Sequence, residues 1–148
     1  MKRLVAVVLF ITLFVGFAGV ASAADWRTVI LGFGGTKGMF FDAESFEENK
    51  SLKTYTVLLK REFHEDYAKK LTNENKYEKL VLYSISKMEF NPAKRQVSAS
   101  YEKYYDENDQ VVAVDNYKGE WVDITAGSVG DSILSVTYEY YKKNYISN

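Results

Sequence analysis

Few residues in this sequence have the types and spacing that chemistry requires, and the first candidates form a glycine-rich run. Residues 32–38 read Gly-Phe-Gly-Gly-Thr-Lys-Gly. A phosphate-binding loop needs glycine, lysine and then serine or threonine, whereas Lys37 here precedes Gly38. A dinucleotide-binding fingerprint that started at Gly32 would need glycine at position 37. We therefore interpret the run as the turn of a β-hairpin.

His64 is the only histidine of the chain, and three carboxylates flank it. A divalent-cation site with Glu62, Glu65 and Asp66 is one alternative, but its ligands would span a strand-to-helix junction that enforces no geometry. The sequence has no nucleophile elbow, and a single histidine without partners makes no nucleophile–base pair. We therefore expect His64 to be solvated, and we expect no catalytic residue, no metal site, no cofactor and no enzyme activity.

The sequence contains no cysteine, which excludes further kinds of functional and structural sites. This absence excludes thiol catalysis, zinc–thiolate sites and disulfide bonds. It also excludes lipid anchoring through a cysteine that follows an export signal. We expect the fold to be stabilised by burial alone, which a domain of this size can achieve.

The N-terminal residues have the three parts of a secretory signal peptide. Two basic residues follow Met1, residues 4–17 are an apolar core, and residues 21–23 form an Ala-Ser-Ala cleavage site. We therefore expect residues 1–23 to be a cleaved signal peptide and residues 24–148 to be a single domain without a stable membrane span. The alternative, an uncleaved membrane anchor, is disfavoured because the apolar run is short and interrupted by threonine and glycine.

The charge balance of the chain is weak and mixed. Of 19 basic and 20 acidic residues, the expected signal peptide removes Lys2 and Arg3, which leaves 17 basic and 20 acidic residues and a net charge of −3. This argues against nucleic acid or an anionic membrane surface as a partner. The middle region of the chain is basic: Lys53, Lys60, Arg61, Lys69, Lys70, Lys76 and Lys79. We interpret these residues by default as a solvated face, and a host-protein or heparin-like contact is the alternative.

Apolar periodicity sorts the rest of the chain into strands and two helices. Alternation and turn residues predict strands at 25–33, 39–42, 51–63, 79–90, 95–106 and 110–115. Helical spacing predicts a short helix at 64–75 and a C-terminal helix from 128 to 144. The predicted fold class is α+β: an antiparallel β-sheet of about six strands in a meander, with the C-terminal α-helix packed on it and one short middle helix.

Alternation also predicts which side chains share a face of the sheet. The strand 51–63 has one apolar face: Tyr55, Val57, Leu59 and Phe63. The strand 95–106 is expected to place four residues together: Val97, Ala99, Tyr101 and Tyr105. We expect residues 47–50 to be a solvated loop, and we expect Trp26 and Trp121 to be core anchors because each brings a large apolar ring.

The C-terminal helix carries the candidate contact residues. We expect Ser128 to cap it with Asp131 as a capping-box partner. Its apolar stripe is predicted to be Val129, Ile133, Val136 and Tyr140, with Thr137 at the edge of the same face. Tyrosines and lysines gather at its end and predict a protein-contact surface there: Tyr141, Lys142, Lys143 and Tyr145. In the alternative, these tyrosines are structural, with Tyr140 packed inward and Tyr141 and Tyr145 lying along the surface.

A set of short motifs runs through the chain: Trp26, Phe41-Asp42, the Tyr105–Asn108 turn with Val111-Val112, Trp121–Ile124 and Gly127–Val129. In these motifs the sequence resembles the surface-adhesin protein E family of small exported bacterial proteins, over about the whole of the expected mature chain. The resemblance implies an antiparallel sheet with a C-terminal helix lying on it. It further implies binding of host extracellular-matrix proteins or plasminogen, and homodimer formation as in some members.

The sequence departs from the family pattern in its cysteines and in one turn. Many relatives carry two cysteines that would pair, one near Asn91-Pro92 and one near Thr137-Tyr138, and this sequence has neither. Asp109 stands where relatives usually have a turn glycine, and Asn108 or Asp109 can adopt the left-handed conformation instead. The missing lipid-anchoring cysteine favours the periplasm over surface display.

These observations predict an exported, non-enzymatic envelope protein that resembles surface adhesins and binds other proteins. We expect it in the periplasm, at the cell surface or secreted, and not lipid-anchored. The alternative is a periplasmic structural or accessory protein whose partner is an envelope component and never a host protein.

Overall fold

The structure, a computed structural model, describes residues 23–146. The predicted signal peptide lies, except for its last residue, outside the described part of the chain. Within that part the elements are β1 (Trp26–Leu31), β2 (Thr36–Asp42), β3 (Glu47–Asn49), β4 (Thr54–Phe63), α2 (Glu65–Glu74), β5 (Tyr83–Asn91), β6 (Gln96–Tyr105), β7 (Val111–Asn116), β8 (Val122–Asp123), α3 (Val129–Tyr141) and the π-helical turn η1 (Lys142–Ile146).

The described strands form one antiparallel sheet. Six of them follow the order β1-β2-β4-β5-β6-β7, while β3 pairs with β4 and β8 pairs with β6. This confirms the predicted α+β meander. The predicted hairpin turn joins β1 to β2, and Gly32, Gly34 and Gly35 have the positive φ angles that such a turn requires. Asp109, with φ of 58°, takes the left-handed position in the β6–β7 turn.

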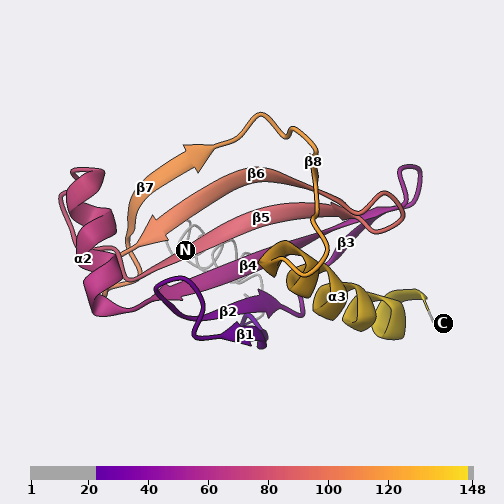
Figure 1. Cartoon of the computed structure of the whole chain (residues 1–148), viewed down its shortest axis with the longest axis horizontal. Coiled ribbons are helices and arrows are strands. Elements are labelled where there is room, and N and C mark those ends of the chain that lie inside the picture. The colour runs from indigo at the N-terminus through magenta and orange to yellow at the C-terminus, as the bar shows by residue number, and fades with distance from the viewer. Residues whose placement is uncertain (1–22, 147–148) are drawn as a thin grey trace, which may run out of the picture.

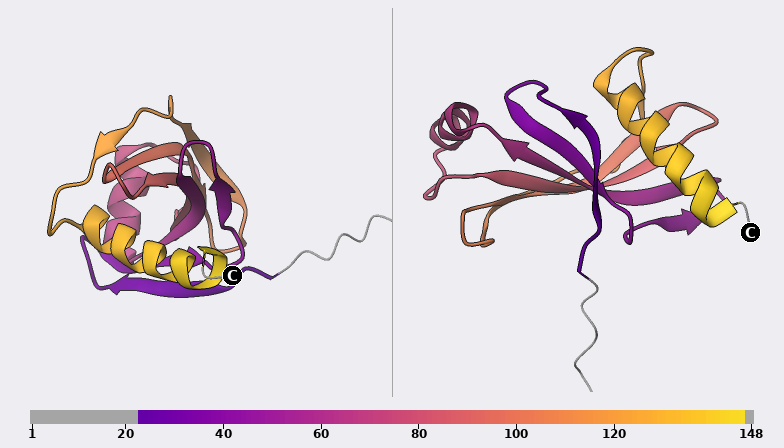
Figure 2. Two further views of the ribbon diagram at one scale, coloured as in Figure 1. Left: turned by 90° about the vertical axis from the view of Figure 1, so that its right-hand side faces the viewer. Right: turned by 90° about the horizontal axis from the view of Figure 1, so that it is seen from below.

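Both helices lie on one side of the twisted sheet (Figures 1 and 2). We call this side the inner face and the opposite side the outer face. The predicted apolar face of β4 is the inner one, because Tyr55, Val57, Leu59 and Phe63 are all buried. Under α3, Tyr55, Val57 and Leu59 pack with Phe41, Phe90 and the apolar side of that helix. A second cluster at the α2 end consists of Phe63, Ala68, Val81 and Tyr104.

A β-bulge in β6 overturns one predicted face. Met88 of β5 pairs with Ala99 but its neighbour Lys87 pairs with Tyr101, so Ser100 is an extra residue. An extra residue reverses the alternation beyond it. The inner face therefore continues from Ala99 to the buried Glu102 and Tyr104, and Tyr101 and Tyr105 point outward. The prediction that Tyr101 and Tyr105 share a face with Val97 and Ala99 is wrong for this reason.

Several predicted element boundaries also change, two of them with structural consequences. Residues 47–50 are not a plain loop, because 47–49 form β3 and pair with β4 although their side chains are exposed. The strand predicted from residue 79 begins only at Tyr83. Before it, the buried Val81 donates its N–H to Thr72 Oγ1 of α2 at 3.1 Å, so the chain is tied to the helix at Val81 and joins the sheet only from Leu82, whose N–H donates to the Tyr105 carbonyl at 2.8 Å.

The two tryptophans are not the core anchors that their size suggested. Trp121 is 40% exposed in the irregular segment before β8. Trp26 is half-buried on β1, with Lys60 Nζ 5.9 Å from its ring. β8 pairs with β6 over only two residues, so the segment that carries Trp121 is held to the sheet over a short length and its ring is little covered.

The C-terminal helix begins as predicted. Ser128 Oγ accepts a hydrogen bond from the Asp131 N–H at 3.2 Å, and the Asp131 carboxylate accepts one from the Gly127 N–H at 2.8 Å. The predicted stripe faces the core, with Ile133 buried and Val129, Val136 and Tyr140 partly buried against the core cluster. The most buried residues extend beyond that stripe: Leu134, Thr137 and Tyr141 are buried as well. Among the described residues, no helix is both long enough and apolar enough to cross a membrane.

Candidate functional site

The residues that first suggested chemistry have structural roles. The backbone N–H of His64 donates to the Gly35 carbonyl at 2.9 Å, which ties the glycine-rich turn to the start of α2. Of the flanking carboxylates, Glu62 pairs with Lys60 at 2.7 Å and Glu65 with Lys69 at 2.5 Å. Within residues 23–146, no three His, Asp or Glu side chains come together as a potential metal site.

One ion pair, with a buried carboxylate and a partly exposed guanidinium, lies between the two apolar clusters. Arg61 on β4 donates to Glu102 on β6, and the Tyr117 hydroxyl donates to the same carboxylate at 3.2 Å. Burial alone would raise the pKa of Glu102, but Arg61, Ser84 and Tyr117 outweigh it and hold that pKa below its usual value. With its charge compensated by Arg61, Glu102 links β6 to β4 across the inner face.

The predicted contact residue Tyr141 is in the core. Its side chain is 4% exposed, and its ring stacks on Tyr55 with centroids 4.8 Å apart. Burial, together with a hydrogen bond to Glu48, raises the pKa of Tyr141 to about 12. The expected surface position of Tyr141 is therefore wrong, and the residue has no free area for a partner.

The other three predicted contact residues remain at the surface, at the end of α3 and in η1. Tyr145 is 43% exposed, although its hydroxyl donates to the Ala43 carbonyl at 3.1 Å and its ring stacks on Tyr141. Lys142 pairs with Glu139 at 2.5 Å. Lys143 is exposed. We call Lys142, Lys143 and Tyr145 the C-terminal surface, and its role in binding stays a prediction.

A second and larger candidate is the outer face of the sheet, which neither α2 nor α3 covers (Figure 2). Pairing places Tyr83, Tyr105 and Val111 side by side across β5, β6 and β7. The Tyr83 and Tyr105 rings are parallel, with centroids 4.8 Å apart. One row further, Ile85 of β5 lies beside Lys103, which lies beside Val114. Val111 and Val114 are 51% and 44% exposed.

Cations and aromatic rings alternate across this face. Lys60 Nζ lies 4.6 Å from the Tyr83 centroid and also faces Trp26, while Lys103 Nζ lies 5.0 Å from the Tyr101 centroid. Lys60 is neutralised by Glu62, whereas Lys103 has no ion-pair partner among the described residues. We call the set the outer surface: Trp26, Lys60, Tyr83, Ile85, Tyr101, Lys103, Tyr105, Val111 and Val114.

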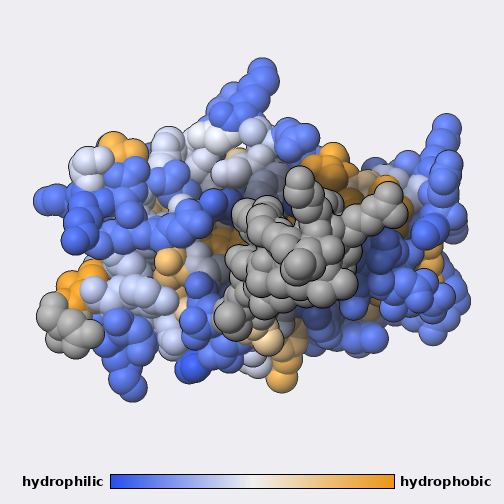
Figure 3. Space-filling view, turned by 180° about the vertical axis from the view of Figure 1, so that it is seen from behind, coloured by the Kyte–Doolittle hydropathy of each residue, from blue (hydrophilic) through white to orange (hydrophobic). Residues whose placement is uncertain are grey.

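The outer surface has the composition of a protein-binding surface. Half-buried tyrosines with exposed aliphatic residues and a few cations are typical of such contacts. Figure 3 shows the molecule from this side, with hydrophobic residues interspersed among hydrophilic ones. This surface does not follow from the apolar alternation of single strands, which indicates only the buried face of each. The alternate residues of neighbouring strands, aligned across the turns, would have indicated it.

Comparisons with known proteins agree with this architecture. The sequence model of the family described as surface-adhesin protein E matches residues 26–137. The solved structure of Haemophilus influenzae protein E superposes with a TM-score of 0.51 at 12% sequence identity, over 84% of this chain and 95% of that one. At such low identity the superposition shows a shared fold. The search of curated protein sequences gave no significant match.

Proposed function

Because the chain belongs to the surface-adhesin protein E family, we propose that it is an exported, non-enzymatic envelope protein that binds other proteins through the outer surface of its sheet. The observation that carries the proposal is a sheet face that neither of the described helices α2 and α3 covers, where stacked tyrosines adjoin exposed valines. Three residues of the family-like motifs, Trp26, Tyr105 and Val111, lie on that face.

The partner chemistry follows from the side chains of the outer surface. Tyrosine rings give large contact areas and lose little conformational freedom on binding. Lys103, which lacks an ion-pair partner within the described residues, favours a partner with an acidic group beside its apolar contact. By family membership, host extracellular-matrix proteins or plasminogen are the proposed partners. An envelope component, with the protein in the periplasm, is the second proposal.

The edge of the same face supports a proposal for homodimer formation. Among the described strands β7 pairs only with β6, so its outer backbone edge is unpaired. Such an edge can accept a strand from another chain, including a second copy. Sedimentation over a range of concentrations tests this, and introducing Pro at Val114 should abolish self-association if the edge forms the dimer.

The binding proposal is tested by comparing two matched double variants. Tyr83→Ser with Tyr105→Ser removes the stacked pair of the outer surface, and Lys143→Ala with Tyr145→Ser alters the C-terminal surface. Binding of immobilised protein to plasminogen, matrix proteins and envelope extract is measured for each. We expect the first variant to weaken binding by about 2 kcal/mol or more, roughly 30-fold, and the second to change it little.

Two outcomes would redirect the proposal. Weaker binding only in the second variant would move the contact to the C-terminal surface. Protection of the protein from protease added to intact cells would favour the periplasmic alternative over contact with a host. The unfolding free energy of both variants is measured alongside, so that loss of fold is not read as loss of binding.

A further inference from the structure

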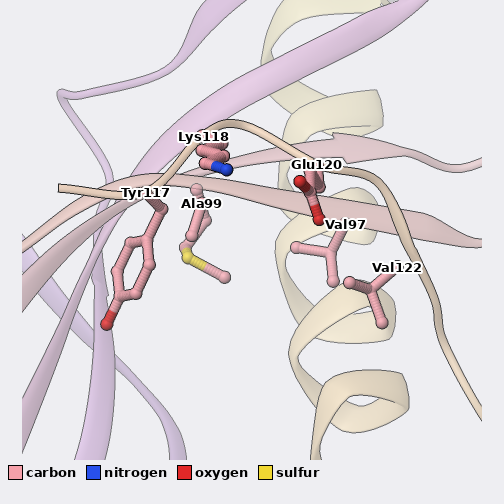
Figure 4. A pocket seen from close by; sticks show the side chains of 7 residues that line it. Val97, Ala99, Tyr117, Lys118, Glu120 and Val122 are labelled. Carbon is pink, nitrogen blue, oxygen red and sulfur yellow. The ribbon is translucent and has the colours of Figure 1, made fainter.

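A pocket of about 600 Å³ lies on the inner face of the sheet, away from the outer surface. Met88 of β5 and Val97 and Ala99 of β6 line it (Figure 4). Residues 117–121, which we call the strap, pass over it, and Tyr117 and Val122 lie towards its two ends.

The pairing of β6 explains why this space exists. β7 leaves β6 after Asn116, which pairs with Tyr101, and β8 returns at Val122, which pairs with Val97. Between them the strap is held at its start, where the Tyr117 N–H donates to the Ser100 carbonyl at 3.0 Å. The strap thus arches over the bulge instead of packing on it, and an apolar hollow remains.

Two opposite charges of the strap lie at this hollow. Lys118 and Glu120 both line the pocket, yet they form no ion pair or hydrogen bond within the described part of the chain. Lys60 and Glu62, also two residues apart, do pair at 2.7 Å. Each strap charge is therefore available to a ligand, and together they present one cationic and one anionic group above an apolar floor.

The size and lining of the pocket restrict its occupant. Its volume falls in the range of small-molecule sites, about 300–1,000 Å³, and exceeds what one inserted side chain fills. Water would find few polar partners on Met88, Val97 and Ala99. The floor suits a hydrocarbon chain, and the paired charges of the strap suit a head group that carries both signs.

We propose that this pocket binds a single-chain zwitterionic amphiphile. The hydrocarbon chain lies on Met88, Val97 and Ala99, the anionic part of the head faces Lys118, and the cationic part faces Glu120. The site stands apart from the outer surface, so it is occupied whether or not a protein partner is bound.

The methionines of the chain give a direct assay. Met88 lines the pocket, whereas Met39 lies buried in the core on β2 and serves as an internal reference. The protein is purified as the cell exports it, labelled with ¹³C-methyl methionine. It is then titrated with an alkyl phosphocholine at concentrations below those at which the amphiphile forms micelles. We expect a saturable shift of the Met88 methyl signal and an unchanged Met39 signal. A Met88 signal that does not move overturns the proposal.

Variants and matched ligands test the two halves of the site. Lys118→Ala and Glu120→Ala, both at exposed positions, should each weaken binding about tenfold. Ala99→Phe should fill the floor and abolish the shift. Alkyl carboxylate and alkyl ammonium ions of equal chain length should bind more weakly, and equal binding of all three refutes the zwitterionic head. Binding to phosphocholine bilayers without binding of the dispersed amphiphile also refutes it.

Discussion

The hydrogen bond between Tyr55 and Thr137 allows a sharp test of the core. Both side chains are buried, and their oxygens are 2.7 Å apart. Thr137 Oγ1 also lies 2.7 Å from the Ile133 carbonyl, to which it donates its only proton. The Tyr55 hydroxyl must therefore be the donor in the first bond, and this makes the two ends of the bond unequal.

The direction of this hydrogen bond determines how much unfolding free energy each substitution should cost. Tyr55→Phe removes the donor and leaves Thr137 still bonded to Ile133, so it should cost only the net value of one hydrogen bond, about 1 kcal/mol. Thr137→Val removes the acceptor and leaves the Tyr55 hydroxyl buried without a partner, which should cost about 1–3 kcal/mol. The double variant should be no less stable than Thr137→Val alone, because no unpaired donor remains.

Urea denaturation of the four proteins, followed by circular dichroism, measures this cycle. Thr125→Val, at an exposed position just before α3, is the matched control and should change the unfolding free energy by less than about 0.5 kcal/mol. Additive effects of Tyr55→Phe and Thr137→Val would refute the assigned bond, and so would a larger loss from Tyr55→Phe than from Thr137→Val.

Three further predictions concern exposure, pH and the glycine turn. Trp121→Ala should cost less than about 1 kcal/mol in urea denaturation and Phe90→Ala about 3–5, because only Phe90 is buried; equal losses would contradict this. The folded-state pKa of Glu102 is lowered, so its contribution to the unfolding free energy is present above its unfolded pKa of about 4.3 and is lost as pH falls through the lower folded value. Glu102→Gln should therefore flatten the acid side of the stability–pH curve. An unaltered curve would count against the ion pair. Gly35→Ala should destabilise the fold by more than about 1 kcal/mol, since φ is +79° and its Cβ would lie 2.6 Å from the Tyr67 ring; a thermal melt like that of the wild type would exclude this contact.

Side-chain periodicity was sufficient for the elements that depend on local chemistry. The alternating run of β4 predicted its buried face because regular pairing preserves period two along a strand. Ser128 with Asp131 predicted the start of α3 because a helix cap is formed by residues adjacent in sequence. The motif resemblance predicted the family, which the match over residues 26–137 confirms.

Periodicity failed where a distant segment determined the outcome. One extra residue at Ser100 reversed the faces of β6, and it is visible only in the pairing with β5. On α3, Tyr140 packs inward on Phe41 as predicted, but the neighbouring Tyr141 is buried too, because its ring stacks on Tyr55 from a distant strand. Nothing in the sequence near Trp121 indicated that the strap would leave its ring exposed.

The sequence by itself determined the fold class and the family of this protein, because strand periodicity, helix caps and family motifs all consist of residues close together in sequence. Only the tertiary structure decided where a partner can bind. A surface such as the one around Tyr83 and Tyr105 is assembled from strands that meet through backbone pairing, and a pocket such as the one beneath the strap exists because one strand leaves its neighbour and another replaces it. Both depend on the register between strands, which no single stretch of sequence contains.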